Sequence, residues 1–150
     1  MERKRKILPP VYLLLTLALM TGFHFLAPIA VFIPAPVSYA GAVLVVLGIT
    51  VASIAAWSFH KAGTPVIPFE PSTALVTGGL YKYTRNPMYL GMLLLLIGIA
   101  VLFGSLGPWL PIPFFIWVIQ ANFICGEERF LESIFGERYL EYKRKVRRWL

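Results

Sequence analysis

Two short polar stretches of this sequence combine side chains that could take part in chemistry. The first, residues 80–91, combines three tyrosines with basic and amide side chains, and the second is the carboxylate pair Glu127-Glu128. Aromatic rings can form the walls of a ligand site, and carboxylates that leave water need a cationic partner. If the two stretches meet in space, they form a site for a small molecule that has an aromatic part and a cationic part.

Asn86 and Pro87 indicate where the first stretch becomes a helix. Asn is a good N-cap, and Pro is tolerated at the first helical position because its missing N–H would be unpaired there. The pair predicts a helix that begins at Pro87 and has its positive dipole end at the polar stretch. A helix start of this kind is a natural seat for a carboxylate or a phosphate.

The elements that must position these residues are apolar. Of the 150 residues, 58% are hydrophobic and 14% are charged, and a soluble domain of this size could not bury so much apolar surface. The apolar runs predict one all-α integral membrane domain with four transmembrane helices, over residues 7–33, 37–59, 88–106 and 109–125. Small residues near one face of the second span indicate close helix packing there: Gly41, Gly48, Ala52 and Ala56.

Two polar segments lie outside the predicted spans. Residues 60–85 contain a Gly-Gly pair and three prolines, which favour an irregular loop at the membrane surface: Pro65, Pro68 and Pro71. Residues 126–150 form the predicted tail, where apolar side chains recur at helical spacing and Gly136 suits a C-cap. The tail is therefore expected to form amphipathic helices.

Basic residues set the predicted orientation. All 14 Lys and Arg lie in the N-terminus, between Lys61 and Arg85, or after Gly126. The positive-inside rule therefore places both termini, the loop and the site on the cytoplasmic side of the cell's inner or plasma membrane. The net charge of +7 lies beside apolar spans, which favours anionic lipid and argues against nucleic acid as the partner.

One imidazole and two amide side chains fall inside the predicted spans. His24 is either a proton or ligand site or a neutral imidazole that bonds to a neighbouring helix. Gln120 and Asn122 lie near the polar end of the fourth span, where we expect interhelical hydrogen bonds.

S-adenosylmethionine carries groups that complement each part of the predicted site. It has an adenine for aromatic walls, a carboxylate for a helix start, and cationic ammonium and sulfonium groups for carboxylates. NADPH would need more basic contacts for its phosphates, and the proline-rich loop supplies few. The residues therefore favour S-adenosylmethionine as the cofactor, and we expect no metal in the site.

Several blocks of the sequence also resemble a known family. They are residues 75–81 (LVTGGLY), residues 85–91 (RNPMYLG), the Glu127-Glu128 pair and residues 135–142 (FGERYLEY). In this order the blocks are similar to the isoprenylcysteine carboxyl methyltransferase family and its phospholipid N-methyltransferase relatives. The resemblance implies a membrane enzyme that uses S-adenosylmethionine to methylate a lipophilic small molecule or a lipid.

The resemblance also implies which residues form the site. Asn86 stands where family members commonly have His, and it cannot carry a charge. Phe123 stands where the isoprenylcysteine enzymes have an Arg that meets the substrate, so a substrate carboxylate loses its obvious partner. The cofactor contacts implied by position are Thr73, Ala74, Leu75, Val76, Tyr81, Asn86, Pro87, Met88, Tyr89 and Glu127.

The implied catalytic residues are Glu127 and Arg85. In-line methyl transfer depends mainly on positioning and on the exclusion of water. Glu127 would hold the cationic part of the cofactor, or act as a base if the acceptor is an amine. Arg85 would orient Glu127 or reach a lipid phosphate. A plain interfacial anchor is the alternative for Arg85, Tyr81 and Tyr89.

The sequence leaves two other functions open. Membrane sterol reductases have a related C-terminal region and bind NADPH, although four spans make this chain short for that class. The other alternative is a non-catalytic membrane adaptor that uses the same fold for packing.

Overall fold

The computed structural model of the protein describes residues 7–27, 29–67, 70 and 72–150, so the basic run 3–6, Pro68 and Pro71 lie outside the described residues. Regular structure in the described residues is helical, as predicted. The α-helices are α1 (Pro9–Leu26), α2 (Gly41–Lys61), α3 (Pro87–Phe103), α4 (Pro111–Ile119), α5 (Cys125–Phe135) and α6 (Glu137–Lys145). Short 3-10 turns precede α2, α3 and α4 (Val37–Ala40, Gly79–Lys82 and Gly107–Trp109), and a π-helical turn, Gln120–Ile124, joins α4 to α5.

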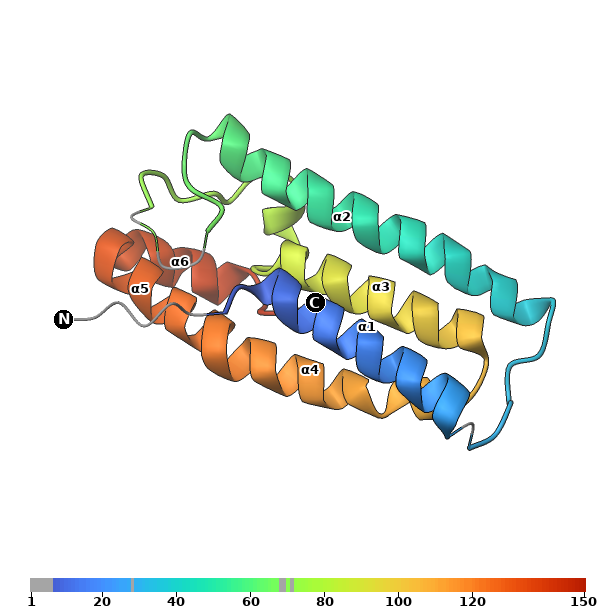
Figure 1. The fold of residues 1–150 in the computed structure, drawn as a ribbon. Coiled ribbons are helices and arrows are strands. Elements are labelled where there is room, and N and C mark those ends of the chain that lie inside the picture. Colours follow the sequence, from blue (N-terminus) through green and yellow to red (C-terminus); the bar gives the residue numbers. More distant parts are fainter. Residues whose placement is uncertain (1–6, 28, 68–69, 71) are drawn as a thin grey trace.

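The helices form an elongated bundle, and one end of it collects the polar segments (Figure 1). The start of α1, the end of α2, the loop that follows α2, the start of α3 and the α5–α6 pair all lie at that end. The turns between α1 and α2 and between α3 and α4 lie at the opposite end, where Val31 and Ser105 form an antiparallel bridge. The prediction that the polar stretches gather at one end of the apolar helices is therefore confirmed.

Three helical stretches are long and apolar enough to cross a membrane: Pro9–Leu26, Val37–Lys61 and Gly107–Phe135. Helix α3 is also apolar but has 17 residues, which gives about 25 Å of helix. It packs against α1, α2 and α4 and so holds a central place in the bundle. The chain is thus an all-helical protein of membrane-spanning character.

The predicted end of the first span, at residue 33, is wrong. Helix α1 stops at Leu26, although the apolar run continues. The N–H groups of Phe32 and Ile33 donate to the carbonyl of Gly104, at distances of 2.9 and 3.1 Å. The end of the apolar run therefore packs against the turn after α3. The Gly104 carbonyl there satisfies backbone N–H groups that would otherwise need partners within a longer helix.

The predicted end of the fourth span, at residue 125, is also wrong. The helix that starts at Pro111 continues through the π-helical turn into α5 and reaches Phe135. Glu127 and Glu128 therefore lie within a continuous helix, one turn after the π-helical segment, rather than after a helix end. Gly136, with φ 53°, then separates α5 from α6, as the tail pattern predicted.

Glycines bring α2 and α3 into backbone contact. A Cβ atom placed on Gly91 would lie 2.6 Å from the carbonyl oxygen of Gly48, and one on Gly98 would lie 2.7 Å from that of Gly41. Such distances are shorter than a real Cβ contact, so only glycine fits at these positions. The predicted small-residue face on the second span is confirmed at Gly41 and Gly48.

The variant Gly91→Ala is expected to lose about 1–3 kcal/mol of stability, because its Cβ would overlap the backbone of α2. Alanine has a higher helix propensity than glycine, so helix propensity alone would make the variant more stable, and a loss of stability would have to come from the overlap. The measurement is thermal unfolding of the detergent-purified protein. Gly22→Ala is the control, since a Cβ there meets nothing within 4 Å; equal unfolding temperatures for both variants would contradict the close contact.

His24 bonds to the opposite turn. Its Nδ1 atom lies 2.8 Å from Ser105 Oγ, and its ring stacks on Phe103 with 4.3 Å between the ring centroids. The interpretation of His24 as an imidazole bonded to a neighbouring segment is the one that this geometry supports.

Candidate active site

Tyr89, in the first turn of α3, and Glu127, in the first turn of α5, are in direct contact. The Tyr89 hydroxyl donates to the Glu127 carboxylate, with 2.6 Å between the two oxygens. In the described part of the chain, no Lys or Arg forms an ion pair with Glu127. Its carboxyl group therefore keeps acceptor capacity, and a cationic ligand would be its charge partner.

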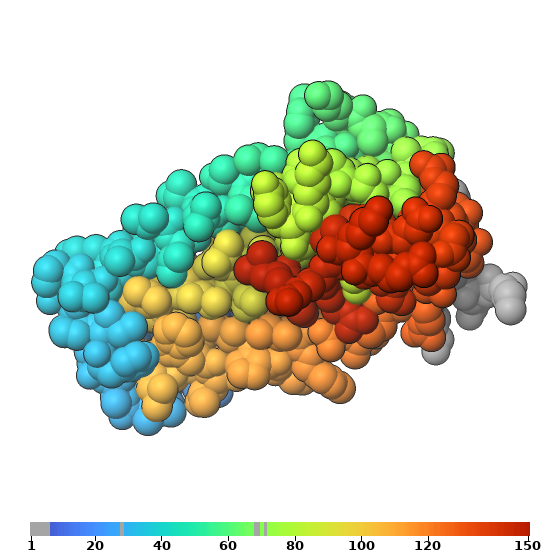
Figure 2. All heavy atoms as spheres, turned by 180° about the vertical axis from the view of Figure 1, so that it is seen from behind, coloured from blue at the N-terminus to red at the C-terminus, as the bar shows by residue number. Residues whose placement is uncertain are grey.

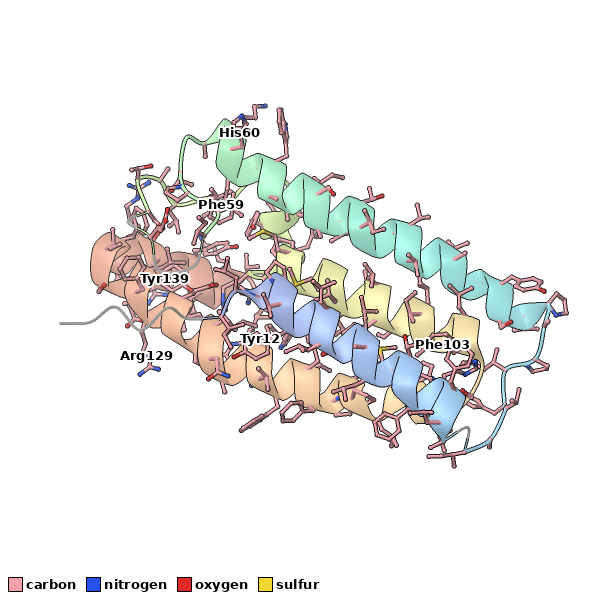
Figure 3. All side chains as sticks on the ribbon, in the orientation of Figure 1. Tyr12, Phe59, His60, Phe103, Arg129 and Tyr139 are labelled. Carbon is pink, nitrogen blue, oxygen red and sulfur yellow. The ribbon has the colours of Figure 1, made fainter. Side chains whose placement is uncertain are left out.

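A cavity of about 70 Å³ adjoins this pair, and its walls come from the loop before α3 and from α2, α3, α5 and α6. Phe59 on α2 and Tyr139 on α6 are two of the wall residues, and both lie at the polar end of the bundle (Figure 3). Among the described residues, the buried Tyr81 hydroxyl and the buried Arg85 Nε have no hydrogen-bond partner. Buried polar groups are nearly always bonded, so unpartnered atoms at a cavity mark positions where a ligand can complete them.

The cavity brings together most of the residues that the sequence predicted for a site. Thr73 is not among them, because it is exposed and its hydroxyl donates to the Gly63 carbonyl. Pro87 is not among them either, because it is fully buried at the first position of α3. The predicted residues that line the cavity are Ala74, Leu75, Val76, Tyr81, Arg85, Asn86, Met88, Tyr89 and Glu127.

Sequence reasoning missed four further lining residues, and it named a fifth, Glu128, only as a member of the carboxylate pair. The tail pattern contained a signal for two of them, because Tyr139 and Tyr142 are three residues apart and so share one face of α6. The sequence predicted amphipathic helices in the tail but did not say what their apolar face contacts, and α6 turns these rings toward the cavity. The missed residues are Phe59, Leu131, Tyr139 and Tyr142.

Arg85 forms an ion pair with the adjacent carboxylate, Glu128, and in the described part of the chain no hydrogen bond or ion pair joins it to Glu127. Arg85 donates to Glu128 Oε1 at 2.8 Å, and the side chains of the pair are 9% and 8% exposed. Arg148 donates two further hydrogen bonds, to both oxygens of Glu128, at 2.9 and 2.7 Å. These bonds raise the pKa of the Arg148 guanidinium. The two neighbouring carboxylates therefore differ, since Glu128 is held by two cations and Glu127 by a neutral phenol.

The residues after α6 hold this network in place. In Figure 2 the red C-terminal segment lies against the yellow start of α3 and the orange α4. The Arg85 guanidinium donates to the backbone carbonyls of Lys143 and Val146, at 3.1 and 2.6 Å. The Trp149 indole donates to the Gln120 side chain at 3.2 Å. Trp149 follows the end of α6, so this bond joins the π-helical turn to the C-terminal segment. The interhelical hydrogen bonds predicted for Gln120 and Asn122 are therefore not found among the described residues.

Asn86 occupies the N-cap position of α3, but its side chain does not cap the helix. Its amide nitrogen instead donates to the Arg148 carbonyl at 2.9 Å, and the Thr84 hydroxyl donates to the same carbonyl at 3.1 Å. The prediction of a helix start at Pro87 is confirmed, and the prediction of a side-chain cap is wrong. The difference arises because the C-terminal segment offers Asn86 a backbone acceptor.

The three cavity tyrosines that lie outside the apolar helices have raised pKa values. Burial is the largest cause in each case, and it raises the pKa of Tyr81 and Tyr142 well above the ordinary value and that of Tyr139 to about 12. The Tyr142 hydroxyl donates to the Tyr81 carbonyl at 2.7 Å. Near neutral pH these side chains are therefore neutral phenols, and they present aromatic walls and hydrogen-bond donors.

The sequence profile of the phospholipid methyltransferase family matches residues 37–138, more than half of the chain. The chain belongs to the phospholipid methyltransferase family. The matched range contains both polar stretches and the Tyr89–Glu127 contact, so the family resemblance is confirmed.

Curated proteins similar to this family member include named methyltransferases. A probable protein-S-isoprenylcysteine O-methyltransferase of Oryza sativa is 32% identical over 73% of this chain and 59% of its own length. A protein-S-isoprenylcysteine O-methyltransferase of Schizosaccharomyces pombe is 36% identical over 48% of this chain and 30% of its own length. An uncharacterised protein of Haemophilus influenzae is 48% identical over 42% of this chain and 100% of its own length.

The chain therefore spans about three fifths of the length of the Oryza sativa methyltransferase. No solved structure matches it.

Proposed function

We propose that this member of the phospholipid methyltransferase family is an integral membrane methyltransferase that uses S-adenosylmethionine and acts on a lipophilic small molecule or a lipid. One observation carries the proposal: Glu127, a carboxylate without a cationic partner among the described residues, meets Tyr89 beside a cavity with aromatic walls. Relatives of the chain are named as methyltransferases, which supports the same reaction class.

The residues of the cavity suit this cofactor chemically. When bound, S-adenosylmethionine supplies an activated methyl group on a sulfonium. Glu127 offers the counter-charge for its cationic part, and the unpartnered Tyr81 hydroxyl and Arg85 Nε offer donors for its polar groups. Ala74, Leu75 and Val76 offer an apolar wall for the adenine.

The size of the cavity adds a requirement. Pockets for ligands of this size usually measure about 300–1,000 Å³, whereas the cavity measures about 70 Å³. One wall is the loop segment 74–76, which is irregular rather than helical. We propose that this wall moves outward when the cofactor binds and closes over it, which also excludes water from the reacting groups.

The chain's own residues act mainly by positioning. Glu127 holds a cation and would serve as a base only for an amine acceptor. Arg85 acts through Glu128, because its guanidinium is bound to that carboxylate and to the C-terminal segment. Phe123, at 2% exposed, is an apolar core residue where the isoprenylcysteine enzymes have an Arg, so we propose an acceptor other than a prenylcysteine carboxylate.

We propose further that α3 also crosses the bilayer, which gives four spans. The position of α3 against α1, α2 and α4 supports this. A hydrophobic helix somewhat shorter than the bilayer is accommodated by local thinning at modest cost. The basic residues that the structure describes lie at the polar end of the bundle, and this placement supports an inner or plasma membrane location, with both termini and the site in the cytoplasm.

Calorimetry on the detergent-purified protein tests the proposed function. S-adenosylhomocysteine is expected to bind and NADPH is not, because the cavity offers one unpartnered carboxylate and few basic groups for phosphates. Binding of NADPH alone would instead support a membrane reductase. Binding of neither compound would support a non-catalytic adaptor.

A further inference from the structure

A second hollow lies beside α5 and shares no lining residue with the cavity described above. It has a volume of about 290 Å³. Asn122, Gly126 and Arg129 line it, and their spacing of four and three residues places them along one side of the helix. Gly126 has no side chain, which leaves room between the other two. Tyr12 of α1 closes the hollow on the other side.

The polar groups of this hollow have donors to spare. Arg129 uses its Nε to bond the Cys125 carbonyl at 3.1 Å, which orients the guanidinium on the helix. Its terminal N–H groups, the Tyr12 hydroxyl and the Asn122 side chain have no hydrogen-bond partner in the described part of the chain. In Figure 3 the Arg129 side chain points away from the bundle.

The carboxylates of α5 that lie near Arg129 in the sequence are bonded to residues other than Arg129. Glu127 accepts from Tyr89, Glu128 is held by Arg85 and Arg148, and Glu132 pairs with Lys143 at 3.3 Å. Arg129 is therefore a cation at the polar end of the bundle without a carboxylate partner among the described residues, and it attracts an anion.

An apolar groove lies next to this hollow. It lies between α1 and α4, has a volume of about 400 Å³, and shares the lining residue Tyr12 with the polar hollow. Leu15, Leu19 and Phe114 line it and are each more than half exposed. A polar hollow that holds a cation, with an apolar groove next to it, matches a molecule with an anionic head and a hydrocarbon tail.

Phe123 lies between Tyr12, which lines both the polar hollow and the groove, and Tyr89, which lines the proposed methyl-transfer cavity. Its ring centroid lies 5.7 Å from that of Tyr12 and 6.5 Å from that of Tyr89, so it packs between them. A molecule in the groove therefore does not reach Glu127 directly.

We infer that the polar hollow and the groove together bind one anionic phospholipid. Its phosphate lies against Arg129, Asn122 and Tyr12, and an acyl chain lies along the groove between α1 and α4. Arginine suits this role because its planar guanidinium donates two parallel hydrogen bonds to a phosphate. The site goes beyond the proposed methyl transfer and does not depend on it.

Native mass spectrometry of the detergent-purified full chain, titrated with phosphatidylglycerol, tests the inference. Wild type is expected to retain one lipid at low ratio, and Arg129→Gln is expected to bind it about tenfold more weakly. Arg138→Gln, which removes an exposed charge on α6, is the matched control and should bind like wild type. Equal affinities of wild type and Arg129→Gln, or an equal loss in Arg138→Gln, would overturn the site.

Two further arms separate the head from the tail. Tyr12→Phe keeps the ring and should weaken binding through the lost hydroxyl, while Leu15→Trp fills the groove and should weaken binding through the tail. Phosphatidylcholine with the same chains should bind more weakly, because its choline already neutralises the phosphate. If sn-glycerol 3-phosphate competes as strongly as the lipid does, the hollow is a site for free phosphate esters and the lipid site is refuted.

Discussion

Replacement of Glu127 by glutamine is expected to weaken the binding of S-adenosylhomocysteine by about 10–100-fold, because a hydrogen bond to a charged group contributes about 1.5–3 kcal/mol. The carboxylate is the negative group at the cavity that no cation neutralises in the described part of the chain. Glutamine has the same shape and keeps an oxygen for the Tyr89 hydroxyl, but it offers no charge to the ammonium group of the ligand. Calorimetry gives the affinity.

The same variant should unfold at the wild-type temperature, because the Tyr89 contact of 2.6 Å survives with an amide acceptor. Glu141→Gln is the matched control, since Glu141 is exposed on α6 and does not line the cavity. It removes one negative charge from the same end of the protein and should leave the affinity unchanged. If Glu127→Gln binds the ligand as tightly as this control does, Glu127 is not part of the site.

The fold followed from the sequence because a bilayer leaves a chain few choices. Long charge-free runs must satisfy their backbone groups internally, so helices over these runs were predictable. The end of the first helix was not predictable from the same runs. The segment after Leu26 is as apolar as the helix before it, and its path depends on the distant carbonyl of Gly104. Hydrophobicity alone does not distinguish a helix from an apolar segment that packs on a neighbouring turn.

The contact between Tyr89 and Glu127 was predictable. Tyr89 follows the start of the third predicted span and Glu127 follows the end of the fourth, and two antiparallel spans bring these ends together. The role of each of the two carboxylates, Glu127 and Glu128, was not predictable. Consecutive residues on a helix point about 100° apart, so only one of Glu127 and Glu128 can face the cavity fully. The π-helical turn at 120–124 changes the rotation of the following residues about the helix axis, and so affects which carboxylate faces the cavity. The sequence contained no pattern that predicted this turn.

The contacts of the C-terminal segment with the site could not be predicted from the sequence, for a different reason. A basic stretch after an amphipathic helix is typical of a lipid-binding surface, and this interpretation fits the exposed Lys145 and Arg147. Arg148 departs from it because the backbone turns it inward to meet Glu128. A charge that pairs with a residue 20 positions earlier leaves no periodic signal in a sequence.

Replacement of Glu128 by glutamine is expected to cost about 3 kcal/mol of stability or more, the range found when one partner of a buried ion pair is removed. Glu128 is 6% exposed, and the Arg85 side chain beside it is 9% exposed. Without the negative charge, the buried Arg85 cation is left with neutral acceptors among the described residues, namely the glutamine oxygen and two backbone carbonyls. Thermal unfolding in detergent measures the loss, and Glu127→Gln, one residue away, is the comparison.

The other arm of the network gives an independent check on the same expectation. Arg148→Gln removes two hydrogen bonds to Glu128 but leaves Arg85 in place, so its loss should be smaller than that of Glu128→Gln. Arg147→Gln should be nearly neutral, because Arg147 is exposed and contributes its backbone carbonyl, which any residue supplies. The order of unfolding temperatures is therefore Arg147→Gln, Arg148→Gln, Glu128→Gln, from high to low. If Glu128→Gln instead unfolds at the same temperature as Glu127→Gln, the ion pairs of Glu128 do not hold the start of α3 against the C-terminal segment. Other contacts would then hold that wall of the cavity in place.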